Sequence, residues 1–213
     1  NMSNKKVCLV IGAGDATGGA VAKRFASEGY VACVTRRTLD KLQPLLDDIH
    51  KAGGVAHGFG SDARKEDEVI ALIDHIESSI GPIDVLVFNI GANSPNSILT
   101  ETARRYTKMW EMACLAGFLN GREVAKRMVS REKDTDQETS GIAHRGTIIF
   151  TGATASLRGS ANFAGFSGGK MALRGLAQSM ARELGPLGIH VAHTIIDGAI
   201  DTEFIRTLFP DKY

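Results

Sequence analysis

Short apolar runs rich in β-branched residues alternate along this sequence with longer stretches in which apolar residues recur at helical spacing. Runs that are apolar almost throughout are typical of strands in a parallel sheet that helices cover on both faces. We expect strands at Val7–Ile11, Val31–Thr35, Val55–Phe59, Asp84–Phe88, Thr147–Phe150 and Ile189–Ala192. The alternation predicts an α/β fold with right-handed crossovers, in which a doubly wound parallel sheet lies between two helical layers.

The stretches between these runs carry apolar stripes that one face of a helix would turn toward the sheet. The stripes of two shorter helices consist of Leu39, Leu42, Leu46 and Ile49, and of Val69, Leu72, Ile73, Ile76 and Ile80. Two longer helical patterns follow at Arg104–Ser130 and Ala161–Leu184, and Gly185-Pro186 is a stop signal for the second. Each pattern predicts a helix that packs against the sheet.

The length of 213 residues is most simply that of one domain, and we expect residues 1–213 to form it. Residues 131–146 interrupt the pattern, because they are highly charged and nearly free of large apolar side chains. This composition predicts an inserted polar surface loop, and a partner-binding element is the alternative.

Charge and cysteine usage narrow the classes of function. Lys and Arg number 25 and Asp and Glu 24, so the net charge of +1 gives no electrostatic reason to expect nucleic acid or an acidic membrane as partner. The three cysteines are scattered and odd in number, which favours a reducing compartment. No ligand spacing typical of a metal site is present, and no run approaches the length of a membrane span. We therefore expect a cytoplasmic protein without a metal.

A glycine-rich segment, Gly12-Ala-Gly14-Asp-Ala16-Thr17-Gly18-Gly19, follows the first predicted strand directly and opens a helix. Glycines at a strand-to-helix turn let backbone N–H groups approach a pyrophosphate, whose charge meets the positive end of the helix. The segment predicts a dinucleotide site in this βαβ unit. The alternative is a turn that packs helix on strand without a ligand.

The second predicted strand ends in Thr35-Arg36-Arg37, where an acidic residue would bind a ribose 2′-hydroxyl. Guanidinium groups at this place favour a 2′-phosphate through charge-assisted hydrogen bonds. Arg36 and Arg37 therefore predict NADP(H) in preference to NAD(H). A solvated arginine pair is the alternative.

Taken together, these segments resemble the short-chain dehydrogenase/reductase family over nearly the whole chain. The family's TGxxxGxG pattern corresponds to Ile11–Gly18, with Ile11 and Ala16 in place of its Thr and its middle Gly. Its adenine-contacting aspartate corresponds to Asp62, and its Asn-Ala-Gly segment to Asn89-Ile-Gly91. The resemblance implies a Rossmann-type fold, a nicotinamide cofactor and a small-molecule carbonyl or alcohol substrate. It also implies a homodimer or homotetramer formed through the two long helices, whose apolar faces could equally belong to the core.

The family's catalytic tetrad is incomplete in this sequence. Its Tyr-x-x-x-Lys pair reads Phe166-Ser-Gly-Gly-Lys170, its serine falls on Ala153 and its asparagine on Cys114. A serine or threonine hydroxyl is a poor substitute for the tyrosine, because its much higher pKa costs roughly 8 kcal/mol of proton-transfer driving force. Lys170 either binds the nicotinamide ribose alone or also works as acid and base through a water.

The segment after the sixth predicted strand keeps two further family residues. Gly198 and Thr202 match positions near the nicotinamide, while Asp197 replaces the family's proline and either faces the substrate cleft or serves the turn. The family's last helix and last strand are not expected, since the sequence ends at Tyr213. The sequence thus favours an NADP(H)-dependent oxidoreductase, with a non-catalytic dinucleotide-binding sensor or scaffold as the alternative.

Overall fold

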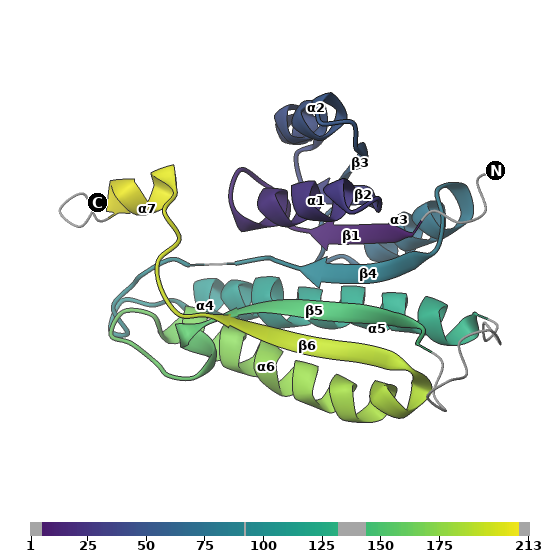
Figure 1. Ribbon diagram of the computed structural model, residues 1–213. Helices are drawn as coiled ribbons and strands as arrows, with labels where there is room; N and C mark the ends of the chain where they lie inside the picture. Colours follow the sequence, from purple (N-terminus) through teal and green to yellow (C-terminus); the bar gives the residue numbers. More distant parts are fainter. Residues whose placement is uncertain (1–5, 92, 132–143, 209–213) are drawn as a thin grey trace.

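A computed structural model describes residues 6–91, 93–131 and 144–208. Its six strands form one sheet in which every neighbouring pair is parallel, in the order β3-β2-β1-β4-β5-β6 (Figure 1). The strands are β1 (Val7–Ile11), β2 (Val31–Arg36), β3 (Val55–Gly60), β4 (Ile83–Phe88), β5 (Gly146–Ala153) and β6 (Ile189–Ile196). This is the three-layer Rossmann-type arrangement that the alternating pattern predicts.

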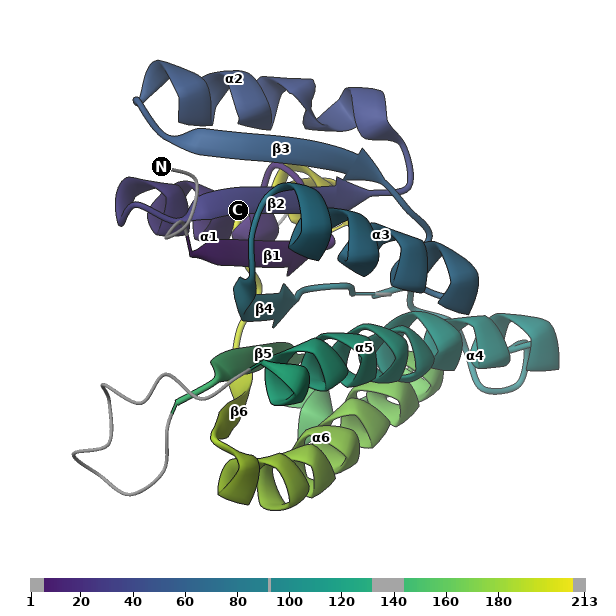
Figure 2. The ribbon, with the colours of Figure 1, turned by 90° about the vertical axis from the view of Figure 1, so that its right-hand side faces the viewer.

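The helices divide between the two faces of the sheet. They are α1 (Thr17–Ser27), α2 (Gln43–Lys51), α3 (Glu66–Ser79), α4 (Ala103–Trp110), α5 (Ala116–Ser130), α6 (Ala164–Leu184) and α7 (Glu203–Leu208). The buried side chains of α1 and α2 pack on one face, and those of α3, α5 and α6 pack on the other. Figure 2 shows α3, α5 and α6 side by side in front of the sheet, with α1 behind it.

The centre of the sheet determines where a ligand can bind. β1 pairs with β2 on one side and with β4 on the other, so that Ile11 lies beside both Thr35 and Phe88. The crossovers run in opposite directions from β1 and from β4, and the loops after these strands therefore separate to leave a crevice. Gly12 and Asn89 are the first residues beyond the two strands and lie at its floor.

Two of the predicted helices differ from their expected bounds. The stretch predicted at Arg104–Ser130 contains α4 and α5, joined by one turn of π-helix, η2 (Glu111–Leu115). Helix α6 begins at Ala164 and not at Ala161, because Asn162 has a φ of 69°, which interrupts helical geometry. Both helices still pack where the pattern places them.

The apolar stripe predicted for the α2 region is partly wrong. Leu39 is 47% exposed, whereas Leu42 and Ile49 are buried, Leu46 is half-buried, and Leu45, which was not predicted, is buried. The chain first makes a 3₁₀ turn, η1 (Leu39–Leu42), and α2 starts only at Gln43, so the helical period does not continue back to Leu39. The stripe predicted for α3 is confirmed in Val69, Leu72, Ile73 and Ile76, which are buried.

The predicted polar loop at 131–146 lies largely outside the described residues, which resume at His144. The described residues on its two sides are joined, because the Arg145 guanidinium donates to the carbonyl oxygen of Arg131 at 2.6 Å. The backbone N–H of Arg145 also donates to the carbonyl oxygen of Gly188. Within the described ranges, no helix is long and apolar enough to cross a membrane. The same ranges contain no cluster of three His, Cys, Asp or Glu side chains able to hold a metal ion.

Candidate active site

The glycine-rich turn after β1 is packed too closely for side chains. A Cβ atom on Gly18 would lie 2.5 Å from the carbonyl oxygen of Gly12, and one on Gly19 would lie 2.2 Å from that of Gly14. Gly12 itself has a φ of +86°, in the region that favours glycine. Because no side chain intervenes, α1 begins directly against the turn, and its first backbone N–H groups face the crevice.

Asn89, predicted to bind the cofactor, fixes this turn from the neighbouring strand. Its backbone N–H donates to the carbonyl of Ile11 at 2.8 Å, and its side-chain Nδ2 donates to the carbonyl of Gly12 at 3.2 Å. Asn89 follows β4, and Ile11 and Gly12 lie at the end of the neighbouring strand β1. These two bonds therefore join the ends of the two strands at the floor of the crevice.

Alanine substitutions at two glycines of this turn should differ in their effect on stability. We expect Gly19→Ala to lower the free energy of unfolding by about 1–3 kcal/mol, because its Cβ collides with backbone that must move. Gly14→Ala is the matched control, since its Cβ would meet nothing nearer than 3.8 Å. Chemical denaturation measures both. Equal stability of the two variants would contradict this packing.

A smaller cavity of about 310 Å³ lies where β2 and β3 end, and arginines dominate its wall. Arg36 and Arg37, predicted from the sequence, both line it, and the Arg36 guanidinium lies beside Gly14 of the turn. The sequence did not indicate a third arginine, Arg64, which also lines it. The cavity is therefore positive next to the glycine-rich turn.

Asp62, the predicted adenine contact, lines the same cavity and is held by Arg64 through two side-chain hydrogen bonds. Arg64 Nε donates to Oδ1 at 2.9 Å and Nη2 to Oδ2 at 2.6 Å. These bonds to the guanidinium lower the pKa of Asp62 to about 2. The charge of Asp62 is thus paired mainly with Arg64, and Arg37 adds a smaller electrostatic attraction. The spacing Asp62-x-Arg64 in a loop was the available signal.

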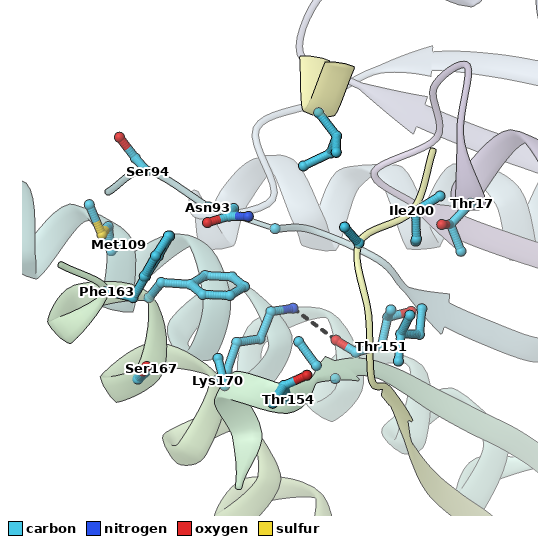
Figure 3. Close-up of a pocket in the computed structure, with 18 of the residues that line it drawn as sticks. Thr17, Asn93, Ser94, Met109, Thr151, Thr154, Phe163, Ser167, Lys170 and Ile200 are labelled. Atoms are coloured by element: carbon cyan, nitrogen blue, oxygen red, sulfur yellow. Dashed lines mark hydrogen bonds between the residues drawn. The ribbon is translucent and has the colours of Figure 1, made fainter. Parts of the chain in front are cut away.

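The larger cavity has a volume of about 800 Å³ and extends from the start of α1 to α4, α6 and the segment before α7. Its wall includes predicted site residues from separate parts of the chain: Ala16, Thr17, Asn89, Gly91, Ala153, Phe166, Lys170, Gly198 and Thr202. Figure 3 shows Lys170 in the middle of the labelled residues, with Thr17 and Ile200 to one side and Met109 and Phe163 to the other. The cavity is open at the carboxyl ends of β4, β5 and β6, where α/β sheets bind ligands.

Lys170 is the buried cation of this cavity, with 4% of its surface exposed. Its Nζ donates to the carbonyl oxygen of Thr151 at 2.8 Å (Figure 3) and to that of Ile90 at 3.1 Å. Burial lowers the pKa of the ammonium to about 8. An ammonium has three N–H donors, so two carbonyl bonds leave one donor for a molecule in the cavity.

The structure brings together two of the three predicted tetrad replacements. Phe166 lies one helical turn before Lys170 on α6, and Ala153 ends β5, and both line the larger cavity. Cys114 lies half-buried in the π-helical turn η2, where Met112 contributes the wall. Burial raises the pKa of the Cys114 thiol.

Two hydroxyls that line the larger cavity, those of Thr154 and Ser167, have no site role in the sequence-based prediction. Thr154 donates a hydrogen bond to the exposed carboxylate of Asp197, which closes β5 onto the end of β6. The bond joins the residues that follow β5 and β6, and both roles left open for Asp197, in the substrate cleft and in the turn, stay predictions. Ser167 is buried in the cavity wall, and its Oγ has no hydrogen-bond partner among the described residues.

Comparison with known proteins identifies the family to which this chain belongs. Residues 6–212 match the short chain dehydrogenase family. The chain belongs to the short-chain dehydrogenase family. A crystal structure of a short-chain dehydrogenase from Rhodopseudomonas palustris is 46% identical, with a TM-score of 0.80, over 92% of this chain and 86% of that one.

Two further members of the short-chain dehydrogenase family are similar over most of their length. The short-chain reductase protein NovJ of Streptomyces niveus is 30% identical over 97% of this chain and 74% of its own. A metagenomic short-chain oxidoreductase solved in complex with NADP is 25% identical, with a TM-score of 0.80, over 94% of this chain and 85% of that one. The match to the family thus extends over nearly the whole chain.

Proposed function

We propose that this short-chain dehydrogenase is an NADP(H)-dependent oxidoreductase that interconverts a small carbonyl compound and its alcohol. The observation that carries the proposal is the position of Lys170, a buried cation with one free donor, in a cavity that begins at the glycine-rich turn. Perturbed buried titratable groups in such cavities are typical of catalytic sites. The complex of a relative with NADP supports the choice of cofactor.

The residues around the turn fit a dinucleotide. Gly12 and Gly18 let the turn pack closely against the start of α1, Gly14 leaves space beside it for a pyrophosphate, and Asn89 holds the turn in place. Asp62 lines the smaller cavity, where it would contact an adenine. Because the carboxylate of Asp62 is paired with Arg64, the net charge there favours a 2′-phosphate.

The cofactor preference is the first test. NADPH should bind about 10- to 100-fold more tightly than NADH, the ratio expected from one or two charge-assisted hydrogen bonds to a 2′-phosphate. We expect Arg37→Asp to reduce the ratio and added salt to weaken it. Calorimetric titration measures these affinities, and Arg24→Asp, on exposed α1 surface, is the charge-matched control. Equal affinities in the wild type would overturn the preference.

The chain's own residues would divide the chemistry as follows. A nicotinamide dinucleotide, when bound, supplies or accepts the hydride. Lys170 has one donor left for the ribose or for a water next to the substrate, and with a pKa of about 8 it holds a proton at neutral pH and can release it. Phe166 supplies no proton and covers the site with an apolar ring. Gly198 and Thr202 close the cavity from the α7 side.

Phe166 favours a second function, non-catalytic binding of a dinucleotide by a sensor or scaffold. The family's general acid would be a hydroxyl at this position, and Ala153 removes the neighbouring hydroxyl as well. Mixing the protein with NADPH and a panel of carbonyl compounds distinguishes the two functions. Oxidation of the bound NADPH supports the enzyme, and tight binding without oxidation supports the sensor.

Assembly and location are also proposals. We infer a homodimer or homotetramer formed through α4, α5 and α6, because Trp110, Phe118 and Met171 on these helices are exposed apolar side chains. A cytoplasmic location is supported by Cys8, Cys33 and Cys114, which are all free thiols.

A further inference from the structure

One face of α4 forms a wall of the larger cavity, and its character changes along the helix. Arg105, Lys108, Met109 and Met112 all line the cavity, at the spacing that places side chains on one helical face. Met112, in the π-helical turn η2 that continues α4, also lines the smaller cavity and therefore lies on the side nearest the dinucleotide site. Arg105 and Lys108 lie toward the other end, at least one helical turn away.

The charged side chains that line the larger cavity are unbalanced. Its described residues include three cations, Arg105, Lys108 and Lys170, and no aspartate or glutamate. Two of these cations already have partners within the protein. Arg105 Nη2 donates to Ser94 Oγ at 2.5 Å and to the carbonyl oxygens of Ser94 and Pro95, and Lys170 donates to two backbone carbonyls.

Lys108 is the cation without such a partner in the described part of the chain. It is exposed at the cavity, and neither an ion pair nor a hydrogen bond of its side chain is present there. The acidic residues nearest to it along the chain are directed at other groups. Glu101 lies 3.9 Å from Arg105, and the charge of Glu111 adds to the effect of Asp62, whose hydrogen bonds raise the pKa of Arg64.

Apolar side chains line the part of the larger cavity that α4 borders. Met109, Phe163 and Phe166 line the cavity, and Figure 3 shows Met109 and Phe163 on the side of Lys170 that is nearer Ser94. A molecule that fills this space would contact polar groups at two ends and apolar ones between them.

We propose that Lys108 binds an anionic group of the substrate, a carboxylate or a phosphate, which an apolar body separates from the reacting carbonyl. This inference rests on the proposed function for the position of the reacting end. Lys108, which has no partner among the described residues, marks the distal end of the site, and an anion that enters the cavity would supply a partner for its charge.

Binding is the readout, so that the test does not depend on turnover. The probes are benzoylpropionate, its neutral methyl ester and the non-reducible anion phenylbutyrate, each titrated by calorimetry into protein saturated with NADP⁺. We expect both anions to bind about fivefold more tightly than the ester, the ratio that one exposed ion pair of about 1 kcal/mol gives. The ratio should fall toward one at high salt.

Variants assign the ratio to Lys108. Lys108→Met should abolish it, and Lys108→Arg should retain it. Lys51→Met, which removes the same charge from the end of α2, should also retain it. Equal binding of anion and ester by the wild type, an unchanged ratio in Lys108→Met, or no binding of either anion would overturn the inference. Anion binding without any turnover would leave it standing and refute only the proposed enzyme.

Discussion

Restoring the missing hydroxyls with Phe166→Tyr and Ala153→Ser in one chain is expected to raise the rate of carbonyl reduction by about 100-fold or more. Both positions line the larger cavity with Lys170, and a positioned general acid contributes about 10²–10⁴-fold. The serine is needed as well, because a tyrosine alone would lack the second donor to the carbonyl oxygen. Steady-state NADPH oxidation with a carbonyl panel measures the change.

NADPH affinity is the control for this double variant. Neither residue lines the smaller cavity, so the dissociation constant of NADPH should change little. Phe166→Tyr alone should gain less than the double variant. A rate that falls when the tyrosine is restored would show that the protein uses a different acid and that the correspondence of Phe166 with the family tyrosine is wrong.

Removing the buried ammonium should have the opposite effect. We expect Lys170→Met to lower the rate of carbonyl reduction by about 100-fold or more, since it removes the cavity's titratable donor. In the wild type the rate of reduction should fall as the pH rises through about 8, where Lys170 loses its proton, and the rate of alcohol oxidation should rise over the same range. Rates from pH 6 to 10, a range of about two units on either side, measure both.

Stability supplies an independent check on that pKa. Burial lowers the folded-state pKa of Lys170 from the usual 10.5 to about 8, so between these values the unfolded chain binds the extra proton. The free energy of unfolding of the wild type should therefore rise with pH across this window, relative to Lys170→Met. Lys126→Met, a change at an exposed lysine, is the control. The same pH dependence in wild type and Lys170→Met would contradict the assignment.

The fold was predictable because local pattern and topology agree. Each of the six apolar runs lies within a strand of the sheet, and runs of this kind are stable only when both faces are covered. The end of β6 was not predictable from apolarity. Residues from His193 to Ile196 extend the strand by pairing with Phe150–Ala153, and backbone pairing requires no apolar side chain.

The site was predictable where residues follow central strands. Gly12 and Asn89 occur far apart in the sequence, but parallel register brings the ends of β1 and β4 together. Residues whose position depends on loops were missed. Arg64 reaches the smaller cavity only because the loop after β3 turns back onto Asp62, and Lys108 reaches the larger one because α4 follows a long irregular segment. The roles of Lys170, Phe166 and the other site residues stay predictions.

The central claim, that this cavity carries out hydride exchange with a carbonyl compound, is tested most directly by a single turnover. Protein loaded with NADPH is mixed with benzoylpropionate and a panel of neutral ketones and aldehydes, and the nicotinamide absorbance is followed. The wild type should oxidise its bound NADPH with at least one carbonyl compound, and Lys170→Met should do so about 100-fold more slowly or not at all. Bound NADPH that persists with every carbonyl compound, or oxidation by Lys170→Met at the wild-type rate, would contradict the account.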